Sequence, residues 1–368
     1  MLLLTPGPVM TRPEVRAALA QDIAPWDNDF KAIYARVLER VRVIAGGIQG
    51  EHVALPLQGA GHFAIEAAVR TFIPPGRKVL IPATGRYSES MIRLTREAGR
   101  IPVVLPVAPN EPTDPLAVEA ALEADPSISH VGQVYSETGS GVIHDAVAIG
   151  AAVRRAGRRM ILDAVSAFGA LPLDLSRQPE IDAVVFTSNK CIEALPGIAF
   201  AVSRIDRLNA CTGQAGSWSL DLADVLSHNG RPRFTPPAQI VAAFDKALDF
   251  FDQEGGRAPR LARYTANAHT FYDGMVRNGL TPWLKREHQG PIIVVIRAPN
   301  DKAWDLQKFV DALKSREILI SNFFNTPTPS FRVGCIGAIT PDDMSRAVAA
   351  MDAALKEIGI TRREAACP

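Results

Sequence analysis

The hydrophobic positions of the chain follow two alternating spacings. Residues 29–46 carry apolar side chains at the i, i+3, i+4 and i+7 positions of an amphipathic helix. After them, short runs that are almost entirely apolar alternate with longer amphipathic runs. The apolar runs predict strands at 52–58, 78–83, 101–107, 130–137, 159–165, 181–188 and 198–204. The amphipathic runs between most of them predict helices at 60–73, 88–99, 115–125 and 146–157.

This alternation predicts an α/β fold with a mostly parallel seven-stranded sheet that is covered by helices on both faces. The predicted strands lack a polar side, as expected where both faces of a sheet are buried. We assign them to one large domain, residues 16–254. The glycine-containing stretch 252–260 predicts a hinge region, and a long helix follows at 261–276.

The last part of the chain repeats the pattern on a smaller scale. Strands are predicted at 291–299, 318–323 and 330–337, and helices at 302–315 and 341–359. These elements predict a smaller C-terminal α/β domain, residues 255–368.

Composition narrows the class of protein. The chain has 368 residues, 47% of them hydrophobic and 21% charged, which is enough for two packed domains. Its formal net charge of +1 gives no reason to expect nucleic acid or an anionic membrane as a partner. Its apolar runs are far shorter than the ~20 residues of a membrane span. The N-terminal MLLLTPGPVM has no basic segment typical of a signal peptide, so we expect a cytoplasmic protein.

The four cysteines predict no disulfide framework and no metal site. Cys191, Cys211, Cys335 and Cys367 form no CxxC pair and no Cys/His ligand spacing. We expect them to be reduced and structural.

Candidate chemistry lies where predicted strands end, because ligands of parallel sheets bind at that edge. The first strand runs through Gly59 and Gly61 into a helix whose free N–H groups could seat a phosphate. Asp163 ends an apolar strand, and Lys190 follows the next one. Taken singly, these features have ordinary explanations: a tight turn, a salt bridge or helix cap, and a solvated loop lysine.

Taken together, a phosphate seat, a buried acid and a strand-end lysine match the requirements of pyridoxal 5'-phosphate. The lysine amine forms a Schiff base with the aldehyde, and the acid keeps the pyridine nitrogen protonated. Burial beside the cationic ring would lower the lysine pKa from its usual ~10.4. We therefore predict that Lys190 and Asp163 share one cleft with this coenzyme.

Eight motifs carry a resemblance that covers nearly the whole chain. In order they are LLTPGP, WDNDF, LQGAGHFAIEA, SETGSG, ILDAVSAFG, SNKCIEALPG, RFTPP and SFRVGCIG. Through them the chain resembles the class V aminotransferases, and among these it is similar to the 2-aminoethylphosphonate–pyruvate transaminases. The resemblance implies the pyridoxal-phosphate-dependent transferase fold of type I. We expect residues 1–15 to form an N-terminal arm near the active site.

The resemblance also implies roles for individual residues. Lys190 would be the Schiff-base lysine and the proton shuttle, and Asp163 would pair with the pyridine nitrogen. Arg332 would bind the acidic end of the substrate. Thr235 would reach the phosphate of the coenzyme in a partner subunit, which implies a homodimer with shared active sites.

Further coenzyme contacts are implied around these residues. Backbone amides of Ala60, Gly61 and His62 would hold the phosphate together with the Ser188 hydroxyl, Tyr87 would stack on the ring, and Thr138 would contact the ring hydroxyl region. Three of the implied residues have structural alternatives. Tyr87 could be a core aromatic residue, Arg332 could form a structural ion pair, and for His62 we favour a satisfied structural histidine.

Two departures from the phosphonate enzymes leave the amino donor open. His62 stands where those enzymes usually have a small residue, and it is more typical of alanine–glyoxylate or serine–pyruvate aminotransferases. Gly139 removes a side chain near the coenzyme, because ETGSG replaces the expected ETTTG.

The favoured function is a ping-pong transamination that converts 2-aminoethylphosphonate and pyruvate to phosphonoacetaldehyde and L-alanine. An alanine–glyoxylate or serine–pyruvate type aminotransferase is the alternative. A lyase or desulfurase is disfavoured because Cys191 adjoins the coenzyme lysine and Cys335 lies in a strand, whereas a desulfurase needs a mobile nucleophilic cysteine. A coenzyme-binding regulator is disfavoured because no DNA-binding segment precedes the domain.

Overall fold

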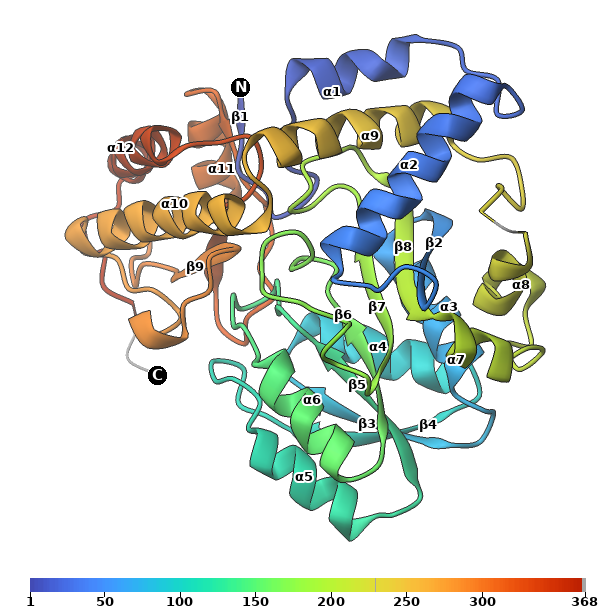
Figure 1. Cartoon of the computed structure of the whole chain (residues 1–368). Coiled ribbons are helices and arrows are strands. Elements are labelled where there is room, and N and C mark those ends of the chain that lie inside the picture. Colours follow the sequence, from blue (N-terminus) through green and yellow to red (C-terminus); the bar gives the residue numbers. More distant parts are fainter. Residues whose placement is uncertain (229, 366–368) are drawn as a thin grey trace.

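The computed structural model describes residues 1–228 and 230–365, and within them a seven-stranded sheet lies at the centre (Figure 1). The strand order is β2-β8-β7-β6-β5-β3-β4, and all strands run in one direction except β8, which is antiparallel to both neighbours. The strands are β2 (His52–Gly59), β3 (Lys78–Ala83), β4 (Ile101–Pro106), β5 (Ile128–Val134), β6 (Arg159–Asp163), β7 (Ile181–Thr187) and β8 (Gly197–Arg204). The predicted mostly parallel, seven-stranded sheet is confirmed.

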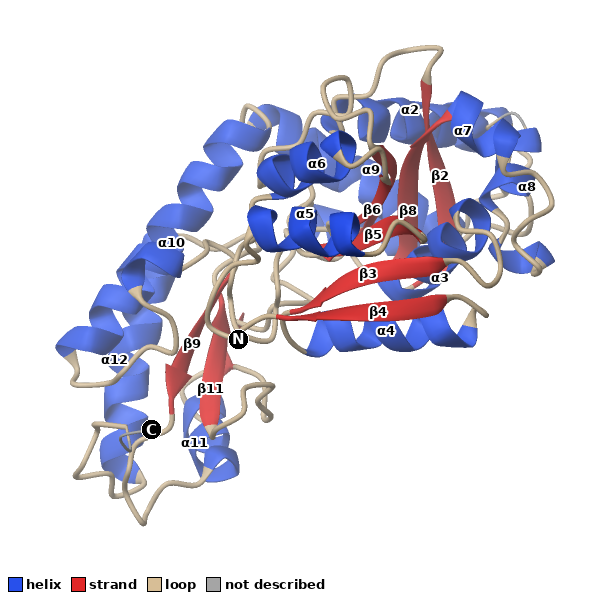
Figure 2. Cartoon of the chain, turned by 90° about the horizontal axis from the view of Figure 1, so that it is seen from below, coloured by secondary structure: helices blue, strands red, loops and turns tan. Residues whose placement is uncertain are grey.

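Helices cover both faces of this sheet because successive strand residues point to opposite sides (Figure 2). In β7, Val184 and Phe186 pack into one core, whereas Ala183 and Val185 pack into the other. The first core is closed by α2 (Asn28–Ile44), α5 (Pro115–Ala124), α6 (Ala146–Arg155) and α9 (Ala238–Gln253). The second is closed by α3 (Gly61–Phe72), α4 (Arg86–Glu97), α7 (Ile205–Ala210) and α8 (Leu222–Ser227).

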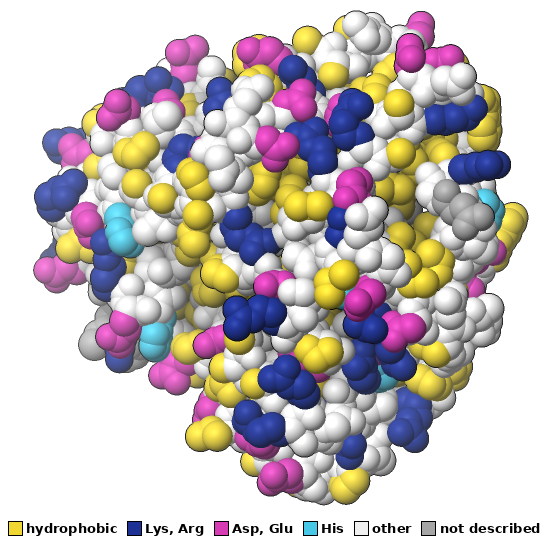
Figure 3. Space-filling view, in the orientation of Figure 1, with side chains coloured by type: hydrophobic (Ala, Val, Ile, Leu, Met, Phe, Trp, Pro, Cys, Tyr) yellow, Lys and Arg dark blue, Asp and Glu magenta, His cyan; other side chains and the backbone are white. Residues whose placement is uncertain are grey.

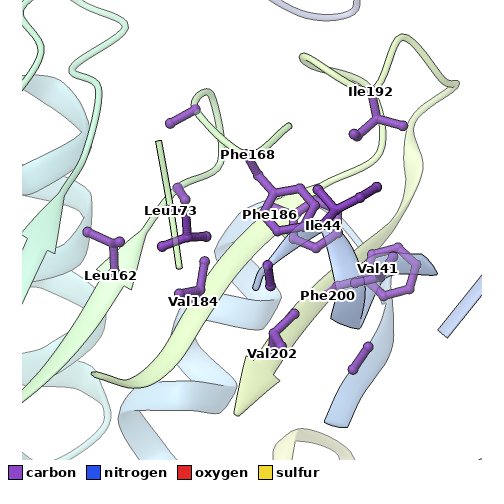
Figure 4. Packing of buried hydrophobic residues seen from close by; sticks show 14 of the residues in the cluster. Val41, Ile44, Leu162, Phe168, Leu173, Val184, Phe186, Ile192, Phe200 and Val202 are labelled. Carbon is purple, nitrogen blue, oxygen red and sulfur yellow. The ribbon is translucent and has the colours of Figure 1, made fainter. Parts of the chain in front are cut away.

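A stack of aromatic rings fills the first core beside the strands that lead to Lys190 (Figure 4). The Phe186 ring lies 3.6 Å from the Phe168 ring and 5.0 Å from the Phe200 ring, centroid to centroid, and all three side chains are buried. Burying each such ring stabilises the fold by about 1.5–3 kcal/mol. Close packing of these rings therefore fixes the end of β7, which leads to Lys190.

The C-terminal part of the chain forms a second, smaller core. Helices α10 (Arg257–Arg277), α11 (Leu306–Lys314) and α12 (Pro341–Glu357) pack against the antiparallel pair β9 (Ile293–Arg297) and β11 (Ser330–Gly334). The first strand of the chain, β1 (Leu2–Leu3), pairs with β10 (Ile318–Leu319) in this region. The strand predicted at 318–323 is therefore only a short parallel pairing. A short helix, α1 (Pro13–Ala17), links this N-terminal stretch to the large core.

The segment that connects the two cores is shorter than predicted. We expected a hinge at 252–260, but α9 continues to Gln253 and α10 already begins at Arg257. Gly255 and Gly256 form the break, with φ angles of +96° and +82° that favour glycine. Pro259 lies in the first turn of α10, where a missing N–H costs the helix nothing, so it does not delay the helix.

Two expectations from composition can be compared with the structure. Cys191, Cys211 and Cys335 are buried and free, and Cys367 lies outside the described residues. Among the described residues, no helix is both long enough and apolar enough to cross a membrane.

Candidate active site

A cavity of about 410 Å³ opens at the carboxyl ends of β6 and β7. Asp163 is the last residue of β6, and Lys190 lies in the turn after β7. Both side chains line the cavity because the two strands are parallel neighbours. The strand order thus brings together the two residues that the sequence placed at strand ends.

The turn between β2 and α3 presents a helix N-terminus to the cavity. Ala60, Gly61 and His62 line it, and no side chain caps the first turn of α3. A Cβ atom on Gly61 would lie 2.6 Å from Val165 Cγ2, so only glycine lets the helix approach this closely. The uncapped N–H groups and the positive end of the helix dipole provide a seat for an anion.

Asp163 is buried in the wall of the cavity. Its Oδ1 accepts a hydrogen bond from the Val165 backbone N–H at 2.9 Å. Burial raises the pKa of Asp163 to about 6, while the Val165 N–H and the charge of Lys190 act in the opposite direction. A buried carboxylate of this kind is expected to pair with a cationic group of a ligand.

Lys190 is also buried, and the N-terminal segment of the chain covers it. Nζ donates to the Pro6 carbonyl at 2.8 Å. The next residue, Gly7, packs so closely that a Cβ atom there would lie 2.4 Å from Nζ. Burial, together with the nearby charge of Arg332, lowers the pKa of Lys190 to about 8, while the charges of Cys191 and Asp163 act in the opposite direction. Lys190 therefore loses its proton more easily than an exposed lysine does.

Tyr87 lines the cavity from the start of α4. Its backbone is held there by Glu137, an acid whose role the sequence analysis missed. Glu137 Oε2 accepts from the Tyr87 backbone N–H at 3.2 Å, and Glu137 Oε1 accepts from the Gly139 N–H at 2.9 Å. Glu137 is fully buried, and burial raises its pKa to about 7. From the sequence, only Thr138 and Gly139 were considered in the segment after β5, and the acid just before Thr138 was the signal that could have identified the contact.

The hydroxyls of Ser188 and Thr138, both implied as coenzyme contacts, instead form hydrogen bonds with other protein groups. The Ser188 hydroxyl donates to the Leu195 carbonyl at 2.5 Å, and its neighbours Thr187 and Asn189 line the cavity instead. The Thr138 hydroxyl donates to Ser166 Oγ at 3.1 Å, away from the lining. The alternation of side chains along the end of β7 explains why Thr187, and not Ser188, faces the cavity.

Arg332 lies in β11 and is buried, and it forms no ion pair with an acid among the described residues. One Nη atom donates to the Thr138 carbonyl at 3.2 Å, and the guanidinium lies 4.6 Å from the Phe323 ring centroid. Within the described chain, Nε of Arg332 has no hydrogen-bond partner. The structural ion pair considered for this residue is therefore absent from this part of the molecule, and the guanidinium keeps donor capacity for a ligand.

A second hollow of about 480 Å³ adjoins the cavity and shares His62 and Tyr87 with it. Phe323 and Asn325, which contact Arg332, line its far side. His62 is exposed at the rim and makes no hydrogen bond within the described residues, so the single chain does not provide the partners of the satisfied structural histidine that we favoured. Partial removal of water by the surrounding cavity walls, followed by the charge of Arg86, lowers its pKa and favours the neutral ring.

Thr235 lies outside the cavity of its own chain. It is exposed, and its carbonyl accepts a hydrogen bond from the Gln58 side chain. A contact with a coenzyme in another subunit therefore stays a prediction.

The class-V aminotransferase family model matches residues 22–322. A 2-aminoethylphosphonate–pyruvate transaminase of Burkholderia ambifaria (strain MC40-6) is 41% identical over 98% of this chain and 96% of that protein. One from Pseudomonas putida (strain GB-1) is 37% identical over 98% of both chains. The solved structure of pyridoxamine–pyruvate aminotransferase from Mesorhizobium loti has a TM-score of 0.89 at 26% identity, and covers 98% of this chain and 93% of that one.

The matched region contains the β2–α3 turn, Asp163 and Lys190, which together form the cavity. It also spans well over half of the chain. The chain is an aminotransferase, and it belongs to the class V aminotransferase family.

Proposed function

We propose that this aminotransferase uses pyridoxal 5'-phosphate to transfer the amino group of 2-aminoethylphosphonate to pyruvate, which yields phosphonoacetaldehyde and L-alanine. The observation that carries the proposal is Arg332, a buried guanidinium with an unused Nε–H beside the cavity of Lys190 and Asp163. A guanidinium recognises the oxygen pairs of a phosphonate and of a carboxylate. The names of the relatives support this pair of substrates.

The cavity has the features that the coenzyme requires at three separate points. The uncapped start of α3 suits its phosphate, the Asp163 carboxylate suits its ring nitrogen, and the Lys190 amine suits its aldehyde. When bound, the coenzyme supplies a protonated ring that draws electrons from the bond broken at the amino donor.

Lys190 carries out the proton transfer in this proposal. Its Nζ would take the proton from the amino-bearing carbon of the donor, hold it as the ammonium, and release it again inside the same cavity as the amino group is transferred. The amine is tethered and buried under Pro6 and Gly7, so no base has to diffuse in and water is kept away. In the second half-reaction Nζ acts in reverse on the way to alanine.

The pH dependence of coenzyme binding tests the state of Lys190. Coenzyme-free protein is expected to capture the aldehyde faster as the pH rises, with a midpoint near the Lys190 pKa of about 8. The reason is that only the neutral amine is a nucleophile. Stopped-flow absorbance over a pH series would measure the rate. A rate that still rises as steeply near pH 10 would show that Lys190 keeps the ordinary lysine pKa.

Arg332→Ala is expected to raise the KM for both substrates by about 10- to 100-fold, because charge-assisted hydrogen bonds each contribute about 1.5–3 kcal/mol. Coenzyme binding should be unchanged, since Arg332 does not line the coenzyme cavity. Steady-state kinetics and coenzyme absorbance would measure the two effects. Arg297→Ala on the paired strand β9 is the control, because that guanidinium packs on Trp283. Normal kinetics for either substrate would remove Arg332 from its role.

Absorbance of the purified enzyme tests the function as a whole. Adding 2-aminoethylphosphonate without a keto acid is expected to convert the yellow lysine-bound coenzyme to its amine form, and pyruvate should restore the yellow band. If only alanine or serine shifts the band, the alternative drawn from His62 replaces the phosphonate function. A protein that stays colourless with added coenzyme would contradict the role of Lys190.

We also propose a homodimer. An apolar hollow of about 410 Å³ lies on the surface near Thr235, and Figure 3 shows hydrophobic side chains gathered between α2 and α8. Phe63, Trp218 and Phe234 are 51%, 70% and 41% exposed in the single chain, an unusual exposure for large apolar residues. Light scattering should give twice the chain mass, and a monomer at micromolar concentration would contradict this assembly.

A cytoplasmic location completes the proposal. The buried, free Cys191, Cys211 and Cys335 support it, since reduced cysteines are typical of that compartment. Cell fractionation would test it.

A further inference from the structure

Helix α10 buries a polar face where an apolar one would be ordinary. Arg260, Arg263, Tyr264 and Asn267 follow the i, i+3, i+4 and i+7 spacing and so share one side of the helix. Arg260, Tyr264 and Asn267 are almost completely inaccessible to solvent. We call these four residues the α10 clamp. Buried polar groups persist only where they have partners, and the partners here lie on two other segments.

The first segment is the turn that carries Lys190. Arg260 donates to the carbonyl of Cys191, the residue directly after Lys190, at 2.6 Å. The Tyr264 hydroxyl lies 3.2 Å from the same carbonyl and donates to Glu193 Oε1 at 2.7 Å. Arg263 donates to the same Glu193 oxygen at 2.7 Å. The α10 clamp therefore holds the backbone within three residues of the reactive amine.

The backbone of this turn needs to be held. Glu193 has a φ angle of +61°, in the left-handed region that residues other than glycine rarely adopt. Its N–H donates to the Lys190 carbonyl at 2.9 Å and closes the turn. Strained conformations at functional sites persist only where surrounding contacts fix them, and the bonds from Arg263 and Tyr264 are such contacts.

The second segment is the stretch that follows Arg332. Arg263 donates to the carbonyls of Gly337 at 2.6 Å and Ile339 at 2.9 Å. The Asn267 amide donates to the Cys335 carbonyl at 3.0 Å. One helix face thus binds the backbone next to Lys190 in the large core and the backbone after β11 in the small core.

The charges of the α10 clamp are balanced locally. Glu254 accepts from Arg260 at 2.6 Å and from Arg263 at 2.8 Å, and Glu193 supplies the second carboxylate. Two acids therefore face two arginines. A buried cluster of this kind is a weak source of stability, because removing the charges from water offsets most of their attraction. Its geometry, which spans both substrate-facing segments, is the feature that needs an explanation.

We propose that the α10 clamp is a positioning element that fixes Lys190 relative to Arg332, so that one substrate molecule is held by its acidic end while its amino-bearing carbon meets Nζ. The inference rests on the proposed function, because it takes Lys190 and Arg332 as the two ends that act on the substrate. The rate of a reaction between a bound substrate and a catalytic group depends on how they are positioned. A displacement of about 1 Å lowers this rate on the order of 10²-fold.

The test is Tyr264→Phe in the coenzyme-loaded enzyme, which removes one hydroxyl and keeps the ring. We expect kcat to fall by roughly 5- to 20-fold, less than a full displacement would cost, with KM changed less than about twofold. Deuterium on the reacting carbon of the donor should slow the variant more strongly than the wild type. Hydrogen exchange of residues 188–195 should become faster, both with and without coenzyme. Tyr272→Phe is the control, since that hydroxyl on the same helix donates to the Leu284 carbonyl instead.

The inference would be overturned if Tyr264→Phe lowered only the melting temperature and kept the wild-type kcat, isotope effect and hydrogen exchange. The α10 clamp would then be a merely structural network. Glu193→Gln is the second variant, which keeps the shape and removes the charge that Arg263 and Tyr264 bind. If Tyr264→Phe does not fold, the same readouts on Glu193→Gln decide. Failure of the proposed function would look different, because the wild-type enzyme itself would then not react with 2-aminoethylphosphonate.

Discussion

Replacing Lys190 by alanine is expected to reduce turnover by about 10²- to 10⁴-fold, the range contributed by a positioned acid–base group. The cavity offers no second amine among the described residues that line it. The covalent link to the coenzyme should disappear as well. Borohydride reduction followed by intact-mass measurement would find the coenzyme attached to the wild-type protein and absent from the variant.

The consequences of Lys190→Ala separate chemistry from folding. The variant should still bind the coenzyme non-covalently, because the start of α3 and Asp163 remain in place. A small added amine such as methylamine should restore part of the rate by replacing the missing proton carrier. Lys308→Ala on the exposed side of α11 is the control and should behave like the wild type. Full activity of Lys190→Ala would assign the chemistry to another residue.

The sequence predicted the sheet because its signal is local. The strands that end at Asp163 and Thr187 have continuous apolar stretches, residues 160–162 and 183–186, and such stretches can be recognised without knowing their neighbours. The placement of Lys190 beside Asp163 followed from parallel order alone. Helices α7, α8 and α9 were missed, since two of them are only six residues long and the third follows an irregular, proline-rich segment.

The sequence did not reveal the contacts that surround Lys190, because they join segments far apart in the chain. Pro6 lies 184 residues from Lys190, and the Arg260–Cys191 bond spans 69 residues. Backbone carbonyls accept both bonds. Because every residue has a carbonyl, the residue types in the sequence do not show which of them accept such bonds. The Glu137 side chain was visible in the sequence, but its role depends on the start of α4, which folding alone brings next to it.

The role of His62 illustrates a different limit. In the sequence it was a departure that pointed to another branch of the family, and it was expected to be a satisfied structural residue. The structure places it at the rim shared by the coenzyme cavity and the hollow beside Arg332. Exposure at a rim depends on how two elements meet, so residue type alone could not decide it.

Asp163→Asn is expected to lower turnover by roughly 10²- to 10⁴-fold while the protein stays folded. Removing one partner of a buried charge pair costs about 3–5 kcal/mol, and the pair here is the carboxylate with the ring nitrogen of the coenzyme. Asparagine keeps an oxygen for the Val165 N–H, so the local backbone has no reason to move. The loss should therefore fall on kcat, and on coenzyme affinity to a smaller extent.

A second buried aspartate provides the matched control for this prediction. Asp182 lies at the opposite end of the sheet, where Arg159, Arg207 and His130 surround its fully buried carboxylate. Asp182→Asn should lower the melting temperature and leave kcat of the folded enzyme unchanged, because its partners lie far from the cavity lining. Asp163→Asn should do the reverse. If both variants lose only stability, the Asp163 carboxylate has no part in the chemistry; if only Asp163→Asn loses kcat, its charge acts on the coenzyme ring.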